Sequence, residues 1–272
     1  MPRPWTIFTL LALSLGLALA PAAAAGSITL RISVRASLQK QKLAVLVKVS
    51  NIGQEAAQRL GYTVLLGREA ARVSGAARLA PGASDQREIT LPFKAPRPGG
   101  YGFGVRVDYH DQRGYPLSAV SWGLFAKQRL AAARLALSGR AGHPWPGAPP
   151  AFVLRNPLDR PLTVRLEVYA PSEFQLERSQ WTLRLAPGQE AVVPVKLSNR
   201  GALTGSTYPL AGLASYLDGG LHHTAAAQVL VRVGALSDPL YAWRPWLWAL
   251  AGLLLAAMLA LAWARRCRRV EP

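Results

Sequence analysis

The chain has 272 residues, of which 50 % are hydrophobic and 17 % are charged. These values exclude a largely disordered chain, and the length suits one large domain or two domains of about 100 residues each. The formal net charge is +18, which points either to a polyanionic partner or to charges spread over solvated strand faces. Cys267 is the only cysteine, so neither an intramolecular disulfide nor a cysteine-based zinc site can form.

Residues 1–25 are predicted to be a secretory signal peptide. Arg3 supplies the positive charge, an apolar run extends from Trp5 to Ala20, and three small residues precede a predicted cleavage after Ala25. No cysteine lies near this exit, which excludes lipoprotein processing. A retained membrane anchor is the alternative.

The next segment, 26–126, alternates apolar and polar residues in short runs separated by turn residues, as half-buried strands do. Several such strands in about 100 residues predict an immunoglobulin-like β-sandwich. The expected strands are 27–35, 42–50, 61–66, 87–93, 102–109 and 117–125.

A linker is predicted over 127–134, and a second immunoglobulin-like β-sandwich over 135–235. Its proline-rich segment 144–150 suits a stiff surface loop. The expected strands are 135–137, 151–155, 162–169, 181–185, 191–197, 208–217 and 225–233.

The segment 244–264 is predicted to be a transmembrane helix, because the 20 residues 245–264 carry no charge and a helix of that length spans about 30 Å. Residues 265–272 form a basic tail that we expect to stay in the cytoplasm. A buried helix of a soluble domain is the alternative. The predicted membrane-interface anchors are Trp243, Trp246, Trp248, Trp263, Arg265, Arg266, Arg268 and Arg269.

Small residues recur every fourth position along the predicted helix, at Gly252, Ala256, Ala260 and Ala264. Such a face lets a second helix approach closely, so it predicts pairing with a membrane protein or with a second copy of the chain. Chance alignment in an alanine-rich segment is the alternative.

Together the ends predict a single-pass protein of the bacterial inner membrane, with its N-terminal domains in the periplasm and its C-terminus in the cytoplasm. The exported part holds 26 Lys and Arg against 13 Asp and Glu, a net charge of +13. Anionic glycan or lipid headgroups are the polyanions expected in that compartment, and nucleic acid is not expected.

The most informative pattern is an internal repeat. The pentapeptide Arg-Leu-Ala-Pro-Gly at 78–82 recurs unchanged at 184–188, 106 positions later. Upstream, a strand ending at Asn51 matches one ending at Asn156, and downstream the segment 100–109 parallels 207–216. Three landmarks in one order and spacing predict two tandem copies of one module.

The repeated pattern resembles two bacterial immunoglobulin-like families, CARDB (cell-adhesion-related domain of bacteria) and the alpha-galactosidase NPCBM-associated domain. The resemblance implies an extracytoplasmic scaffold or binding module, and these families have no catalytic residues to carry over. The resemblance rests on residues 45–51, 79–82 and 93–108 of the first copy and on residues 153–156, 185–188 and 195–216 of the second.

Candidate chemistry is sparse. His222 and His223 are neighbours on a predicted strand and so point to opposite faces, which excludes joint chelation of one ion. They and the matching pair His110-Asp111 are expected to be polar loop tips. Glu173 and Glu177 could form a glycosidase pair but suit a solvated loop better. We therefore predict no enzyme activity, no metal and no cofactor.

Aromatic residues offer a possible sugar-stacking surface. Trp122 and Trp181 fit equally well inside the sandwiches, and Trp145 in the proline-rich loop is the ligand contact that we predict to be exposed. The other aromatic candidates are Tyr101, Tyr109 and Tyr115.

The sequence thus predicts an all-β protein of two tandem immunoglobulin-like β-sandwiches plus one C-terminal transmembrane α-helix. The predicted function is that of a non-enzymatic, membrane-anchored scaffold or adhesion-type protein that binds a protein partner in the envelope, such as an accessory subunit of an export or assembly system. The alternative is an anchored module that binds anionic carbohydrate through Trp145 and basic residues.

Overall fold

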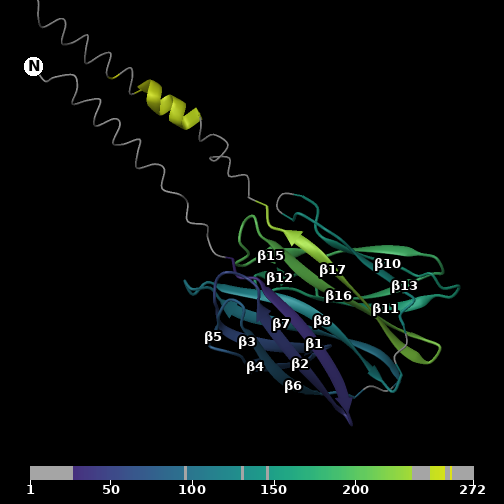
Figure 1. Cartoon of the computed structure of the whole chain (residues 1–272). Coiled ribbons are helices and arrows are strands. Elements are labelled where there is room, and N and C mark those ends of the chain that lie inside the picture. The colour runs from purple at the N-terminus through teal and green to yellow at the C-terminus, as the bar shows by residue number, and fades with distance from the viewer. Residues whose placement is uncertain are drawn as a thin grey trace, which may run out of the picture.

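The computed structural model describes residues 27–94, 97–129, 132–144, 147–234, 246–254 and 258. Two hydrophobic clusters lie in this part of the chain, one within residues 43–125 and the other within 135–233. Figure 1 shows the strands that surround them as two β bodies packed together. We call them the N-terminal and the C-terminal sandwich.

The N-terminal sandwich has one sheet of order β1-β2-β6 and a second of order β8-β7-β3-β4, with β5 paired to β3. A pairing of β7 with β17 makes the second sheet part of a nine-stranded sheet that continues into the C-terminal sandwich. Neighbouring strands within each sheet are antiparallel. The strands are β1 (Leu30–Gln39), β2 (Lys42–Asn51), β3 (Ala57–Leu66), β4 (Glu69–Ser74), β5 (Arg78–Leu79), β6 (Ser84–Pro92), β7 (Gly99–His110) and β8 (Pro116–Lys127).

Alternation in the sequence builds this core. On β2 every second residue, including Val45 and Val47, is fully buried, and on β7 Phe103 and Val105 are fully buried against them in the same cluster. Burying a valine or phenylalanine side chain contributes about 1.5–3 kcal/mol, so the two facing strands hold the sheets together.

The C-terminal sandwich pairs a sheet of order β14-β10-β9 with one of order β13-β11-β16-β17, and β12 and β15 form a separate pair. Phe152 and Leu154 of one sheet and Leu166 and Leu210 of the other fill its core. The strands are β9 (Ala136–Arg140), β10 (Ala151–Arg155), β11 (Leu162–Tyr169), β12 (Phe174–Leu176), β13 (Gln180–Leu185), β14 (Glu190–Pro194), β15 (Leu197–Asn199), β16 (Thr207–Asp218) and β17 (Leu221–Arg232).

The repeated sequence landmarks contact each other in both sandwiches. The buried Asn51 donates from Nδ2 to the Leu79 carbonyl at 3.1 Å, and its Oδ1 accepts the Gly53 N–H at 3.0 Å. Asn156 does the same with the Leu185 carbonyl at 3.2 Å and the Leu158 N–H at 3.0 Å. Each asparagine therefore joins the end of its strand to the Arg-Leu-Ala-Pro-Gly turn, which explains why the two landmarks recur together.

The all-β class predicted from the sequence is confirmed. Strands β4, β5, β12 and β15 were not predicted, because each is short or lacks a clear alternation. The single strand expected over 191–197 is wrong. The chain leaves β14 at Pro194 and enters β15 in another sheet, since proline has no N–H to continue a ladder.

The predicted signal peptide lies outside the described residues, as do the predicted interface anchors Trp243, Trp263, Arg265, Arg266, Arg268 and Arg269. The described part of the predicted membrane segment is helical over 246–254, and Trp246 and Trp248 are exposed there. Among described residues, no helix has the length and apolar character needed to cross a bilayer. The transmembrane span thus stays a prediction from the sequence.

Candidate functional site

The two sandwiches meet along β7, in which glycines alternate with large residues. Tyr101 and Phe103 belong to the N-terminal core. Because successive side chains on a strand point to opposite faces, Gly102 and Gly104 lie on the outer face of this sheet. That face is covered by the C-terminal sandwich.

The glycines allow a close approach that any other residue would prevent. A Cβ atom on Gly102 would lie 2.9 Å from Leu213 Cδ1 and 2.9 Å from Thr224 Cγ2, and one on Gly104 would lie 2.8 Å from Tyr169 Cγ. Leu213 sits on the outer face of β16 but is only 3 % exposed, because it packs into the space above the glycines. The outer faces of the two sheets are therefore complementary in size.

His222 joins the two sandwiches through its backbone and its ring. Its N–H donates to the Pro98 carbonyl at 2.9 Å, its ring Nδ1 lies 2.8 Å from the Gly100 carbonyl, and its ring stacks on Tyr101 with centroids 3.9 Å apart. One registered pair, His222 with Gly99, connects β17 to β7 in parallel. Burial lowers the pKa of His222, so the interface favours the neutral ring.

The buried carboxylate of Glu173 makes a second contact between the two sandwiches. Glu173 is 4 % exposed and accepts hydrogen bonds from the Ser118 N–H at 2.7 Å and from the Ser118 hydroxyl at 2.6 Å. The Ser118 Oγ in turn accepts the Ser172 N–H at 2.7 Å. Nearby, the Tyr115 hydroxyl donates to the Gly201 carbonyl. Since Ser118 lies on the edge strand β8, Glu173 satisfies an edge N–H that would otherwise need another partner.

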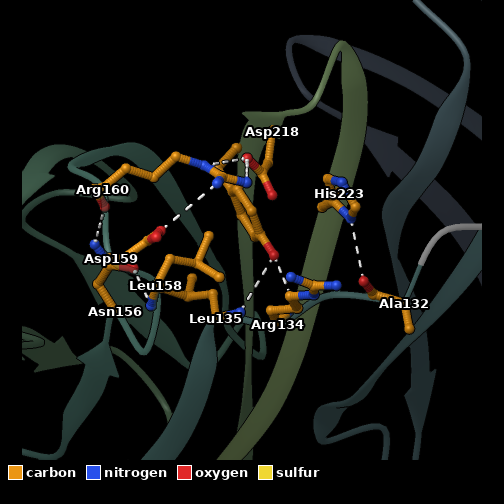
Figure 2. A network of polar contacts seen from close by, with 10 residues as sticks. Ala132, Arg134, Leu135, Asn156, Leu158, Asp159, Arg160, Asp218 and His223 are labelled. Carbon is orange, nitrogen blue, oxygen red and sulfur yellow. Dashed lines mark hydrogen bonds and ion pairs between the residues drawn. The ribbon is translucent and has the colours of Figure 1, made fainter. Parts of the chain in front are cut away.

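The segment between the sandwiches is held on the C-terminal sandwich, as Figure 2 shows. The Tyr216 hydroxyl accepts the N–H groups of Arg134 at 2.7 Å and Leu135 at 3.2 Å. The His223 ring stacks on Tyr216 with centroids 5.1 Å apart and lies 3.2 Å from the Ala132 carbonyl. In the same view Arg160 donates to Asp218 at 2.8 Å. These contacts fix the path along which the chain enters the second sandwich.

A groove of about 750 Å³ opens between the sandwiches. Arg165 and Glu167 form an ion pair at 3.0 Å within it, and the Tyr169 hydroxyl donates to Glu167 at 2.8 Å. Burial and the Glu167 charge raise the pKa of Tyr169, which keeps that hydroxyl protonated as a donor. Arg68 and Lys94 also line the groove, so it can hold a polar or anionic group.

Comparisons with known proteins bear on the N-terminal sandwich. The CARDB family model matches residues 27–112. This stretch is a CARDB-like immunoglobulin-like module. The match ends before β8, the strand that completes the sheet carrying the glycines. No curated protein matches the chain.

Several solved structures resemble parts of the chain. Red sea bream transglutaminase is 14 % identical over 73 % of this chain and 31 % of its own, with a TM-score of 0.25. The putative ApaA protein from Bordetella pertussis is 19 % identical over 38 % and 96 %, with a TM-score of 0.28. An Escherichia coli alpha-2-macroglobulin is 12 % identical over 78 % and 22 %, with a TM-score of 0.30. The chain thus spans less than a third of the transglutaminase.

The structure corrects several candidate residues. Tyr101 and Tyr109 are buried in the core of the CARDB-like module and offer no sugar-stacking surface. Trp181 packs against the C-terminal core, as its strand position allowed, and Trp122 is half-buried. Trp145, the predicted ligand contact, lies outside the described residues.

The charged candidates are also placed differently from the prediction. Glu173 and Glu177 are not a solvated pair, because Glu173 is buried on Ser118 whereas Glu177 is exposed and pairs with Lys196 at 3.8 Å. His222 and His223 are not loop tips. They lie within β17 and turn to opposite sides, one against the CARDB-like module and the other against Tyr216.

The described residues contain no group of three or more His, Cys, Asp and Glu side chains that could hold a metal ion. Of the predicted membrane-packing face, only Gly252 is described, and a Cβ there would meet no atom within 4 Å.

Sequence reasoning missed the contact between the sandwiches. One signal was available: three glycines at alternate positions of a strand indicate that another backbone or side chain comes close on that face. The Ser118–Glu173 contact had no such signal, since a serine and a glutamate 55 positions apart carry no pattern.

Proposed function

We propose that the protein is a non-enzymatic, membrane-anchored scaffold of the bacterial envelope that binds a protein partner outside the cytoplasm. The observation that carries this proposal is the packed contact between the sandwiches. Gly102, Gly104, His222 and the buried Glu173 hold two β bodies in one orientation. A fixed pair of sandwiches suits a spacer that presents outer faces and loops to a partner, because orientation is set before binding.

The two sandwiches are, on this proposal, tandem copies of one module. The support is the equivalent hydrogen bonding of Asn51 and Asn156, each of which joins a strand end to the same pentapeptide turn. The turn glycines also share a left-handed backbone, with φ of 77° at Gly82 and 69° at Gly188.

The anchor is proposed from the uncharged run 245–264 and the arginines that follow it. Cys267 provides a direct test, because it is the only cysteine. In spheroplasts, a membrane-impermeant maleimide should label Cys267 only after permeabilisation. In a Cys267→Ser background, Ser37→Cys should be labelled without it. Labelling of Cys267 in sealed spheroplasts, or protection of Ser37→Cys, would overturn the topology.

A partner in the same membrane would meet the end of the molecule that precedes the anchor. At this end the Gly205 N–H donates to the Val233 carbonyl at 2.8 Å, and Leu203 beside it is 44 % exposed. A photo-crosslinking amino acid at Leu203 should capture one membrane protein in living cells. The same group at Lys40, which is exposed in the β1–β2 turn at the other end, should not. The absence of a crosslinked product at Leu203, or equal products at both positions, would contradict the proposal.

Association through the helix is a separate part of the proposal. Gly252→Ile and Ala256→Ile should weaken membrane two-hybrid association, because they fill the small-residue face. Leu253→Ile is the matched control on a neighbouring face, and an equal effect of all three would remove this face from the proposal.

A further inference from the structure

The outer face of the β1-β2-β6 sheet is a charged surface to which the proposed scaffold function assigns no ligand. The register of the three strands sets its composition, since residues alternate between core and solvent. We call it the basic face. It consists of Arg31, Ser33, Arg35, Ser37, Gln39, Lys42, Ala44, Leu46, Lys48, Ser50, Ser84, Gln86, Glu88, Thr90 and Pro92.

Its charges lie in a line. Lys48 is opposite Ser33, which lies midway between Arg31 and Arg35, so these three cations follow one another about 7 Å apart along the strands. Lys42 extends the row to about 26 Å from Arg31. Glu88 is the only acidic residue of the basic face, and within the described residues none of the four cations forms an ion pair.

A short polar residue, Ser33, separates Arg31 from Arg35 on β1, whereas Ala44 and Leu46 lie between Lys42 and Lys48 on β2. The hydroxyls of Ser50 and Ser84 lie 2.7 Å apart across β2 and β6. Ser33 is exposed opposite Lys48, and Ser37 and Thr90 are exposed on either side of Ala44, further along the strands. Such groups both donate and accept hydrogen bonds, and they do not obstruct a ligand that lies along the sheet. The surface can therefore hold a linear hydroxylated polyanion over its whole length.

The corresponding sheet of the C-terminal sandwich lacks this row. Its outer face carries Arg140 and Arg155, but Arg155 is opposite Glu190, and Val153 and the exposed Val192 separate the charges. The line of cations thus belongs to the CARDB-like module and is not a general property of the basic chain.

The direction of the strands distinguishes a polymer from a bilayer as the ligand. Both ends of the described β bodies lie at one end of the molecule (Figure 1), where Gln54 donates to Ser27, Gln112 to Glu55 and Gly205 to Val233. Strand β1 starts at this end and runs away from it. A chain anchored after residue 234 would hold the basic face along the side of the molecule and not against the lipid.

We propose that the basic face binds a linear acidic polysaccharide, whose carboxylates pair with Arg31, Lys48, Arg35 and Lys42 while its hydroxyls contact the serines and Thr90. This site goes beyond the scaffold function and does not depend on a protein partner or on Trp145.

The test uses the full-length chain, immobilised, with polygalacturonate as the probe and dextran as the neutral polymer. Polygalacturonate should bind with an affinity that falls as salt rises, and dextran should not bind. The variant Arg31→Ser, Arg35→Ser, Lys48→Ser should raise the Kd at least about tenfold, since each exposed charge contact is worth roughly two- to fivefold.

The matched control removes the same net charge elsewhere, with Arg140→Ser, Arg155→Ser and Arg184→Ser, all exposed on the C-terminal sandwich. It should change the Kd less than about twofold if screening limits charge effects to the contact itself. Equal losses in both variants, or no binding of polygalacturonate, would overturn the site. So would binding to phosphatidylglycerol vesicles that the basic-face variant abolishes while polymer binding is unchanged. Equal melting temperatures would show that both variants fold.

Discussion

The two sandwiches share buried tyrosines at two inward-facing positions and differ at the outward-facing positions between them. In the matched strands β7 and β16, the inner positions Tyr101 and Tyr208 are both buried aromatics, as are Tyr109 and Tyr216. The outer positions Gly102 and Gly104 correspond instead to Pro209 and Ala211.

The difference has a physical reason. Two identical outer faces that carry large side chains could not interpenetrate, whereas a face of glycines accepts the side chains of the other, as Gly102 accepts Leu213. The inner pattern therefore makes a sandwich, and the outer pattern decides which surface packs against it, as at the contact between the two sandwiches.

The largest expected effect tests the shared interior. Phe103→Ala should reduce the free energy of unfolding by about 3–5 kcal/mol, and the matched Leu210→Ala by about 2–5 kcal/mol, because both side chains are fully buried. Urea unfolding measures both losses. A loss below 1 kcal/mol in either would mean that the two cores are not comparable.

The buried asparagines test whether the repeated turns are equivalent. Asn51→Ala and Asn156→Ala each leave buried backbone groups without a partner, so each should cost about 1–3 kcal/mol. Urea unfolding of the two variants should give losses of similar size. A large loss in only one would break the equivalence of the two turns.

The interface glycine tests the difference between the sandwiches. Gly104→Val should cost about 1–3 kcal/mol through collision with Tyr169, and calorimetry should then resolve two transitions, because the sandwiches no longer support each other. Thr90→Val, at an exposed strand position, is the control and should keep the wild-type profile. An unchanged profile for Gly104→Val would mean that the contact is not required for cooperative unfolding.

The turn glycines should show a smaller, matched effect. Gly82→Ala and Gly188→Ala place a side chain at positive φ where no atom lies within 4 Å. Each should therefore reduce the free energy of unfolding only through backbone strain, by about 1–2 kcal/mol. Thermal melts of both variants should shift by similar amounts, and unequal shifts would show that the two turns differ in context.

The smallest effect concerns pH. Burial lowers the pKa of His222, so the unfolded chain binds the proton more strongly than the folded one. Its contribution to stability is therefore complete above the unfolded pKa of about 6.5 and is lost as pH falls through the lower, folded pKa. His222→Gln should flatten this part of the stability profile, and an unaltered slope would exclude His222 as its source.

Much of the fold could be predicted because burial imposes a period of two on each strand. The alternation of β1 and β2 and the landmarks at Asn51 and Asn156 were readable for this reason. Strand β4 could not be predicted, because it is a short edge strand in which two small alanines give no clear alternation. The chain passes from β14 to β15 just after Pro194. This proline was visible in the sequence, but a single strand was predicted across it.

The candidate site was less predictable than the fold. Tyr101 was a possible sugar-stacking residue because an aromatic residue on a strand suits either face, and only packing showed that it faces the core. Glu173 was expected in solvent because a lone glutamate normally is, and its burial depends on Ser118 from a distant strand.

The strand content and the repeated turns could be predicted because both follow from spacing along the chain. The row of cations needed the pairing of β1 with β2, and folding was also needed to show that Gly102 and Gly104 receive a second sandwich, that His222 stacks on Tyr101 and that Glu173 is buried. These contacts depend on which outer face of one sandwich packs against which outer face of the other. Because they join residues that are far apart in the chain, no periodic pattern in the sequence reveals them.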